Sequence, residues 1–241
     1  MEPYPAIAPL RPELNLQGKT VLITGGGKLH PSPRSMSLYA NLSLATGIGL
    51  ATSWAFAQAG VIILAIMARS EAQMAKAKKE IEAKHPGTQV KTCAASVTDA
   101  VAVDDFIKGL GVIDILILNA GVARAPSSVV DTNSDDLVND FSINVFGNFN
   151  VLKAYLALPP RSADAKRTVV YTSTAGAYMA QPGFGAYSAS KMAMSQLVRH
   201  VALEEANKGV RVFTIHPAAT LTDMAKTVGF KEGQIQFDAG E

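Results

Sequence analysis

Residues 20–60 read TVLITGGGKLHPSPRSMSLYANLSLATGIGLATSWAFAQAG, and this stretch decides the fold. Its first segment, 20–24, is short, β-branched and apolar on both faces, as is typical of a central strand in a parallel sheet. Residues 47–60 place apolar side chains at helical spacing and end at a glycine, which favours a helix. Glycines between a strand and a helix permit a tight turn, so the stretch predicts the start of a βαβ unit.

The same alternation of apolar strands and helical segments continues to the end of the chain. It predicts further strands at 61–67, 90–95, 113–119, 168–173 and 210–216, and helices at 70–85, 101–110, 134–158 and 187–208. Strands that alternate with helices indicate an α/β fold, a Rossmann-like doubly wound parallel sheet with helices on both faces. We expect one domain over residues 1–241, of which residues 1–17 form a leader. Ligands of such a sheet bind at the carboxyl ends of its strands.

The composition excludes several classes of partner. The 22 lysines and arginines nearly balance the 20 acidic residues, so the sequence predicts binding neither to nucleic acid nor to a membrane surface. A single cysteine, Cys93, fits a reducing compartment, and the N-terminal residues lack the pattern of an export signal, so we expect a cytoplasmic protein. No metal site is expected, because the histidines have no ligand-like spacing: His30, His85, His200 and His216.

Candidate catalytic side chains follow the predicted strands. Tyr187 and Lys191 are four residues apart at the start of a helix, so the phenol and the ammonium share one helical face. A nearby ammonium favours phenolate and would lower the tyrosine pKa from its usual value of about 10. Ser173 ends one predicted strand and faces the same cleft. The segment Asn119-Ala120-Gly121 follows another strand, and Asn144 lies inside a predicted helix.

The sequence resembles the short-chain dehydrogenase/reductase family, in particular its fungal members. The resemblance lies in motifs that follow one another in the family's order: the glycine-rich loop, Asn119-Ala120-Gly121, the helix residue Asn144, Ser173 and the YSASK motif at 187–191. The resemblance covers residues 18–224. It implies an oxidoreductase that interconverts a carbonyl and a secondary alcohol on a small molecule, in secondary-metabolite biosynthesis. It also implies a homo-oligomer formed through the helices at 134–158 and 187–208.

The resemblance assigns a role to each catalytic candidate. Tyr187 would be the general acid, and Lys191 would lower the pKa of Tyr187 and hold the nicotinamide ribose. Ser173 would hydrogen-bond the substrate oxygen. Thr174 stands thirteen residues before Tyr187, the usual distance of the family's serine, but the Ser-x-x-Gly pattern favours Ser173. Asn144 would place a water in a proton relay, or it is a buried amide that satisfies a helix kink.

The resemblance also implies a nicotinamide cofactor. Arg69 follows the second strand, where NAD-preferring members carry an acidic residue, so NADP(H) is expected in preference to NAD(H). In the last cofactor segment, Ala218 replaces the family's glycine and restricts the backbone. The expected cofactor-binding residues are Gly25, Gly47, Ile48, Gly49, Arg69, Val97, Asn119, Ala120, Gly121, Tyr187, Lys191, Pro217, Thr220 and Thr222.

Two departures from the family pattern leave a second interpretation open. Residues 28–45 form an insertion in the cofactor loop, so Gly25 and Gly47 need not converge and NADP(H) binding should be weak. The codons available to 27–45 can encode in-frame splice signals, which favours a translated intron over a genuine insertion. The tail at 225–241 is short, and we expect the sheet to lack its last strand. The alternative function is therefore an impaired homologue that acts as a binding or scaffold protein or has no function.

Overall fold

The structure is a computed structural model that describes residues 11–25, 47–218, 220–229 and 237–238. The insertion at 28–45 lies outside the described residues, as do residues 1–10 of the leader and most of the tail at 225–241.

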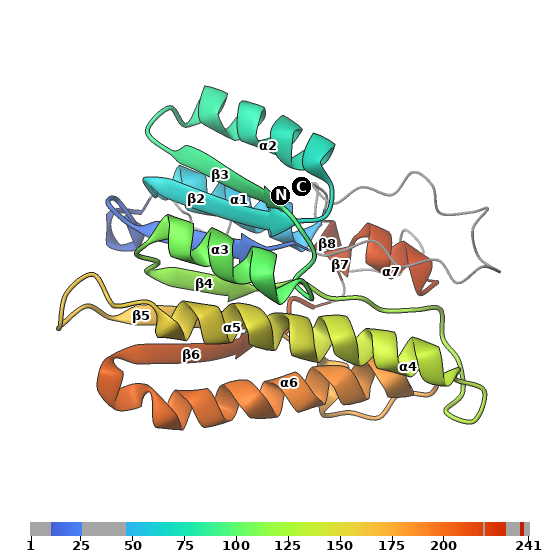
Figure 1. Ribbon diagram of the computed structural model, residues 1–241. Coiled ribbons are helices and arrows are strands. Elements are labelled where there is room, and N and C mark those ends of the chain that lie inside the picture. The colour runs from blue at the N-terminus through green and yellow to red at the C-terminus, as the bar shows by residue number, and fades with distance from the viewer. Residues whose placement is uncertain (1–10, 26–46, 219, 230–236, 239–241) are drawn as a thin grey trace.

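Among the described residues, six parallel strands form one sheet, as the sequence predicts (Figure 1). Their order is β3-β2-β1-β4-β5-β6, which reverses between β1 and β4. At such a switch point the carboxyl ends of the strands open into a crevice for ligands. The strands are β1 (Thr20–Thr24), β2 (Ile63–Ala68), β3 (Gln89–Ala94), β4 (Ile115–Leu118), β5 (Arg167–Thr172) and β6 (Val210–Ile215).

Helices cover both faces of the sheet (Figure 1). They are α1 (Ile48–Gln58), α2 (Glu71–Lys84), α3 (Ala100–Leu110), α4 (Ser134–Phe141), α5 (Asn148–Ala157), α6 (Gly185–Glu204) and α7 (Asp223–Thr227). Successive residues of β1 point to opposite faces, because strand side chains alternate. Leu22 packs in the core under α3, α5 and α6, whereas Val21 and Ile23 pack in the core under α1 and α2. This burial on two faces explains why β1 is apolar throughout.

The helix predicted at 134–158 is interrupted. A π-helical segment, Ser142–Gly147, separates α4 from α5. Such π segments are rare and occur often at functional sites. Gly147 at its end lies against Val97, and a Cβ at this position would collide with the valine side chain. The glycine therefore lets the loop after β3 approach the π segment closely.

In the described part of the chain, β6 pairs only with β5, as expected for a sheet without a further strand at this edge. Its side chains Phe213 and Ile215 are 52% and 41% exposed. Two short strands, β7 (Thr220–Leu221) and β8 (Phe237–Asp238), form a separate parallel pair. None of the described helices is both long and apolar enough to cross a bilayer.

Candidate active site

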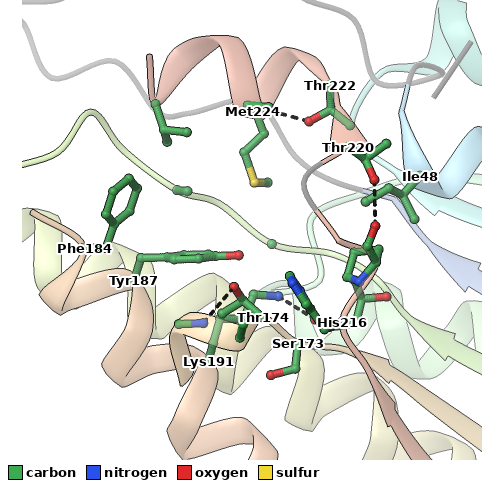
Figure 2. A pocket seen from close by; sticks show the side chains of 18 of the residues that line it. Ile48, Ser173, Thr174, Phe184, Tyr187, Lys191, His216, Thr220, Thr222 and Met224 are labelled. Atoms are coloured by element: carbon green, nitrogen blue, oxygen red, sulfur yellow. Dashed lines mark hydrogen bonds between the residues drawn. The ribbon is translucent and has the colours of Figure 1, made fainter. Parts of the chain in front are cut away.

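A cavity of about 320 Å³ opens at the carboxyl ends of β4, β5 and β6 (Figure 2). Its size is within the range of small-molecule sites. The start of α1, the first turns of α6 and helix α7 complete its walls. Of the predicted residues, the cavity brings together Ile48, Asn119, Gly121, Ser173, Tyr187, Lys191, Pro217, Thr220 and Thr222.

Tyr187 and Lys191 lie on the first turns of α6 and face the cavity together (Figure 2). The Lys191 Nζ lies 6.0 Å from the centre of the Tyr187 ring and 5.1 Å from that of Tyr171. It donates a hydrogen bond of 2.8 Å to the carbonyl of Thr172, at the end of β5. The ammonium is therefore fixed by the backbone of β5 behind the tyrosine.

Burial controls the proton affinity of both groups. It lowers the pKa of Lys191 to about 8, because the charged form loses its hydration. The pKa of Tyr187 is raised to about 12, first by burial, against an opposing hydrogen bond from Thr174, and further by the negative charge of Asp140. The expected lowering of the Tyr187 pKa is thus wrong for this structure, because the loss of hydration dominates and the Lys191 ammonium is not among the groups that shift this pKa.

Ser173 and Thr174 point in different directions after β5. The Ser173 hydroxyl is buried and lies 2.9 Å from the Ser195 hydroxyl of α6, at the cavity floor. The Thr174 hydroxyl interacts with Tyr187 and also accepts a hydrogen bond from the Gly176 amide at 3.3 Å. Figure 2 shows Thr174 beside the phenol oxygen, whereas the Ser173 hydroxyl points away from it. Of the two candidates, Thr174 is the one whose hydroxyl is beside the phenol.

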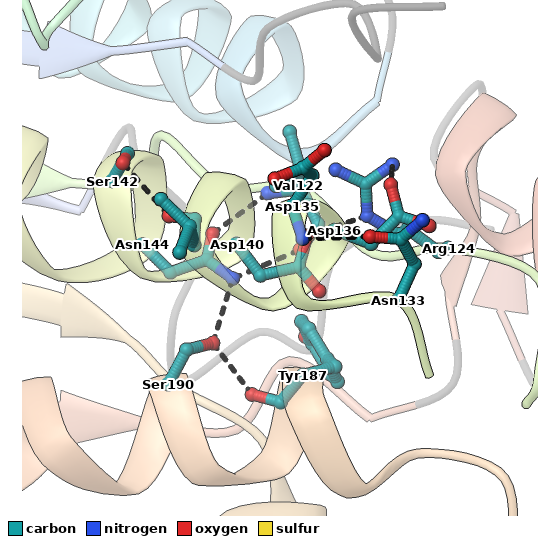
Figure 3. Close-up of polar contacts among 11 residues, drawn as sticks. Val122, Arg124, Asn133, Asp135, Asp136, Asp140, Ser142, Asn144, Tyr187 and Ser190 are labelled. Carbon is teal, nitrogen blue, oxygen red and sulfur yellow. Dashed lines mark hydrogen bonds and ion pairs between the residues drawn. The ribbon is translucent and has the colours of Figure 1, made fainter. Parts of the chain in front are cut away.

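Asn144 is fully buried in the π-helical segment. Its Oδ1 accepts from the Val122 amide at 2.8 Å, and its Nδ2 donates to the Val122 carbonyl and the Ser190 hydroxyl, both at 2.9 Å. Ser190 in turn donates to the Tyr187 carbonyl at 2.7 Å (Figure 3). The side chain thus joins the loop after β4 to the first turn of α6, which agrees with the buried-amide interpretation. The water-relay role is untested.

The predicted Asn119-Ala120-Gly121 segment is held by a residue that the sequence analysis did not single out. The Thr24 hydroxyl, at the end of β1, accepts from the Asn119 and Ala120 amides at 3.0 and 3.1 Å. A Cβ on Gly121 would lie 3.1 Å from the Lys191 Nζ, so the glycine leaves room for the ammonium. A threonine after an apolar strand could have been read as a candidate for this contact.

The two described parts of the interrupted glycine loop lie together in space. A Cβ built on Gly49 would be 3.7 Å from the Gly25 Cα and 2.9 Å from the Asn119 Nδ2. Gly47 adopts a φ of +85° immediately before α1, a conformation that favours glycine. Gly25 and Gly49 thus lie close together, whereas the expected separation of Gly25 from Gly47 stays a prediction. The α1 N-terminus, which can bind anions, faces the site.

Arg69 lines a second, smaller pocket with Gly25, Ser96 and Val97. Its Nε and Nη2 atoms are buried, and neither has a hydrogen-bond partner among the residues that the structure describes. Burial also lowers the pKa of the guanidinium. Buried donors without partners are costly, so this arginine fits a site that an anion completes.

The segment after β6 closes the cavity from the side of α7. The Thr220 hydroxyl donates to the Pro217 carbonyl at 2.8 Å, and the Thr222 hydroxyl accepts from the Ala225 amide at 3.1 Å to cap α7. A Cβ on Gly47 would lie 3.1 Å from the Thr222 methyl group. Ala218 has a φ of +58° and is the one non-glycine residue in the described ranges with a positive φ. The alanine is therefore strained where glycine is favoured.

Two further groups of the site were missed by sequence reasoning. Asn148 Nδ2 donates to the carbonyls of Ala120, Ile143 and Asn144, and so ties the loop after β4 to the π segment. Asp140 is buried in an ion pair with Arg124. Neither is part of the family pattern used above. Their signal in the sequence is a polar residue at a helical position that would otherwise be apolar.

The comparisons with known proteins agree with this geometry. Residues 43–233 match the family model for short chain dehydrogenases. The chain belongs to the short chain dehydrogenase family of oxidoreductases. A short chain dehydrogenase/reductase of Aspergillus aculeatus is 34% identical over 86% of this chain and 66% of its own length. A relative from Claviceps purpurea is 34% identical over 93% of the chain and 70% of its own length. This dehydrogenase thus spans about two thirds of the length of these curated relatives.

Solved structures show the same fold. The L-sorbose reductase of Gluconobacter frateurii, solved with NADPH and L-sorbose, has a TM-score of 0.72 at 20% identity, over 87% of this chain and 72% of its own. The 3-ketoacyl-(acyl-carrier-protein) reductase of Brucella melitensis, solved with NADH, has a TM-score of 0.74 at 22% identity, over 88% and 80%. These two reductases differ in the cofactor bound to them, and their likeness to this chain establishes the fold alone.

Proposed function

We propose that this chain is an NADP(H)-dependent oxidoreductase that interconverts a carbonyl and a secondary alcohol on a small molecule. The observation that carries the proposal is the placement of the Tyr187 phenol and the buried Lys191 ammonium at one cavity, with the Thr174 hydroxyl beside the phenol. A proton donor, a fixed positive charge and a hydrogen-bonding hydroxyl are the groups that carbonyl reduction requires at the oxygen atom.

The protein's own groups act on the carbonyl oxygen. The phenol O–H bond of Tyr187 breaks as its proton passes to the oxygen, and the resulting phenolate lies near the Lys191 ammonium. Thr174 hydrogen-bonds the phenol and is placed to orient the substrate oxygen, with Ser173 supporting the cavity floor. A bound nicotinamide supplies the hydride to the carbonyl carbon, and alcohol oxidation reverses these transfers.

The residues present fit a dinucleotide. Gly25 and Gly49 keep the α1 N-terminus free of side chains, which is the environment a pyrophosphate requires. Asn119, Gly121 and Lys191 would hold the nicotinamide ribose, and Pro217, Thr220 and Thr222 would flank the nicotinamide. Val97 and Ala120 would lie beside the adenosine part.

The preference for NADP(H) is supported by Arg69. Two of its buried nitrogen atoms have no partner among the described residues, and a 2′-phosphate would offer these donors several charged acceptor oxygens, whereas a 2′-hydroxyl would offer one neutral acceptor.

The cavity favours an uncharged substrate. Among the described residues that line it there is no carboxylate and no arginine, and its one ammonium is bound to the Thr172 carbonyl. Phe184, Met224 and Val228 contribute apolar walls on the side away from the cofactor residues. We propose a small apolar ketone or alcohol as the substrate, with a role in the secondary metabolism of the cytoplasm.

The long helices support assembly into a homo-oligomer. On α4, the π segment and α5, Val138, Phe146 and Phe149 are 62%, 60% and 43% exposed, and on α6 Met192 is 55% exposed. Apolar side chains of this size on exposed helices are typical of protein interfaces. Sedimentation of the purified chain tests this part of the proposal.

Consumption of NADPH with a panel of uncharged ketones tests the reaction. The wild-type chain should oxidise NADPH, and Tyr187→Phe should lower kcat/KM by about 10²- to 10⁴-fold, the usual contribution of a general acid. NADPH affinity of the variant, measured by fluorescence titration, should stay within about threefold. Turnover that Tyr187→Phe leaves unchanged would exclude this mechanism. NADPH binding without turnover of any ketone would favour the alternative, a binding or scaffold protein.

A further inference from the structure

Asp140 is a buried carboxylate that the proposed mechanism does not use. It lies on α4 with 1% of its surface exposed, one helical turn before Asn144. Its Oδ1 accepts from the Arg124 Nε at 3.0 Å, and the Arg124 Nη1 contacts Asp136 at 2.9 Å. Arg124 follows the Asn119-Ala120-Gly121 segment, so it brings a cation from the loop after β4 onto α4 (Figure 3).

The carboxylate faces the catalytic tyrosine. Helices α4 and α6 pack against each other, and Figure 3 shows Asp140 on the side of α4 that is turned toward Tyr187. The link from Asn144 through Ser190 to the Tyr187 backbone holds the two helices together beside it. The negative charge of Asp140 raises the pKa of Tyr187.

The other ionisable groups around the Tyr187 phenol do not place a negative charge beside it. Lys191 faces it from the same helix, and Tyr171 on β5 is a phenol whose pKa burial raises, so it is neutral at neutral pH. Asp136 contacts the same arginine as Asp140 but is 39% exposed, and it is not among the charges that act on Tyr187. Asp140 is therefore the buried anion that the fold places behind the phenol.

A buried carboxylate is costly, because the charge loses its hydration. Burial raises the pKa of Asp140 to about 6, even though Arg124 opposes the shift. At neutral pH the group is still ionised, and a fold that needed only packing could carry an apolar residue here.

We propose that Asp140, held by Arg124, is a positioning residue whose negative charge opposes ionisation of the Tyr187 phenol and so sets the alkaline limit up to which the phenol can donate its proton. The inference rests on the proposed function for the role of Tyr187 as proton donor. The electrostatic coupling between Asp140 and Tyr187 does not depend on that function. Below about pH 6 Asp140 gains a proton, and its influence on the phenol is lost.

The coupling can be measured without substrate or cofactor. The protein is labelled with 3-fluorotyrosine, whose ring fluorine brings the phenol titration into an accessible pH range, and is followed by ¹⁹F NMR. The Tyr187 signal is assigned by its loss in Tyr187→Phe. Asp140→Asn preserves the shape and removes the charge, so the Tyr187 titration midpoint should fall by about 0.5 to 1.5 pH units, as expected for a like charge within the protein. Asp136→Asn, the matched control, should leave the midpoint unchanged.

The outcomes separate the two proposals. A midpoint in Asp140→Asn within about 0.2 units of wild type, or an equal shift in Asp136→Asn, overturns the inference, whether or not the chain reduces ketones. If Asp140→Asn fails to fold, Asp140→Ser, which leaves room for a water, replaces it with the same expected shift. In an active enzyme the alkaline limb of the kcat/KM profile for ketone reduction should move to lower pH together with the NMR midpoint.

Discussion

The Lys191 ammonium lies 6.0 Å from the centre of the Tyr187 ring and is held there by one hydrogen bond, 2.8 Å long, to the Thr172 carbonyl. The lysine is 3% exposed and has no carboxylate partner within the described residues. The fold therefore places the ammonium beside the phenol and the cavity, although the ammonium loses its hydration there. A group held in this way should lower the stability of the fold that carries it.

Lys191→Met should raise the free energy of unfolding at pH 7 while it abolishes ketone reduction. A lysine pKa of about 8 in the folded state, below its value in the unfolded chain, corresponds to a penalty of about 3 kcal/mol. Loss of the partner of the Thr172 carbonyl offsets about 1 kcal/mol of the gain. The penalty is complete below pH 8 and disappears as the pH rises toward 10.5. The free energy of unfolding of the wild-type protein should therefore increase between these pH values, whereas that of Lys191→Met should not. Urea denaturation at pH 7 and pH 10 checks both statements, and a less stable methionine variant at pH 7 contradicts them.

Thr174 and Ser173 should differ in what their hydroxyl groups contribute. Thr174→Val keeps the shape beside the Tyr187 phenol but removes the hydrogen bond, so kcat/KM should fall by about 10- to 100-fold and the alkaline limb of its pH profile should move to higher pH. Ser173→Ala breaks the buried contact with Ser195, which should cost about 1 kcal/mol of stability and change kcat/KM less than threefold. Steady-state kinetics and thermal denaturation of the pair distinguish the two. A larger loss of kcat/KM in Ser173→Ala than in Thr174→Val would indicate that Ser173, rather than Thr174, binds the substrate oxygen.

The sequence was sufficient for the fold because most strands are short runs rich in apolar and β-branched residues that alternate with segments of helical spacing. The alternation of Leu22 with Val21 and Ile23 between two cores follows directly from strand geometry. The break between α4 and α5 was not predicted, because it depends on Asn144 and Gly147 meeting the loops after β4 and β3, which are distant in the sequence. The identity of the residue whose hydroxyl lies beside Tyr187 was not predicted for a similar reason. A shift of one residue along an extended segment turns the side chain to the opposite face, and sequence spacing did not settle between Ser173 and Thr174.

Arg69 should decide between the two cofactors. Arg69→Gln removes the buried guanidinium and should weaken NADPH binding by about 10- to 100-fold while NADH binding changes less than threefold. Arg211→Gln, which removes an exposed arginine on β6, is the control for the loss of one positive charge. Fluorescence titrations with both nucleotides give the comparison. Equal losses of NADPH and NADH affinity in Arg69→Gln would mean that the arginine does not read the 2′-phosphate.

Ala218→Gly should stabilise the protein. Ala218 has a φ of +58°, where an L side chain costs about 1 to 2 kcal/mol, and glycine recovers most of this despite the greater freedom it gives the unfolded chain. We expect a gain of about 0.5 to 1 kcal/mol in the free energy of unfolding. Gly209→Ala, at a φ of +76°, should lose a similar amount and serves as the converse variant. A destabilised Ala218→Gly protein would show that the backbone at 218 has a negative φ in solution.

The interruption of the glycine loop gives the last prediction. Gly25 and Gly49 lie close together in space although they are far apart in the sequence. The cost of closing a loop grows only with the logarithm of its length, so an insertion between these glycines does not by itself prevent folding, but its place in the sequence is the loop where a pyrophosphate should bind. We expect weak NADPH binding by the chain as written, and at least about tenfold tighter binding once residues 27–45 are replaced by one alanine. A variant with a Gly/Ser segment of equal length in place of 28–45 tests whether the length of the insertion alone weakens NADPH binding. If length alone is responsible, NADPH binding by this variant should stay weak. Superimposable NADPH titration curves for the native and shortened chains would contradict the prediction and leave the insertion as a tolerated part of the cofactor loop.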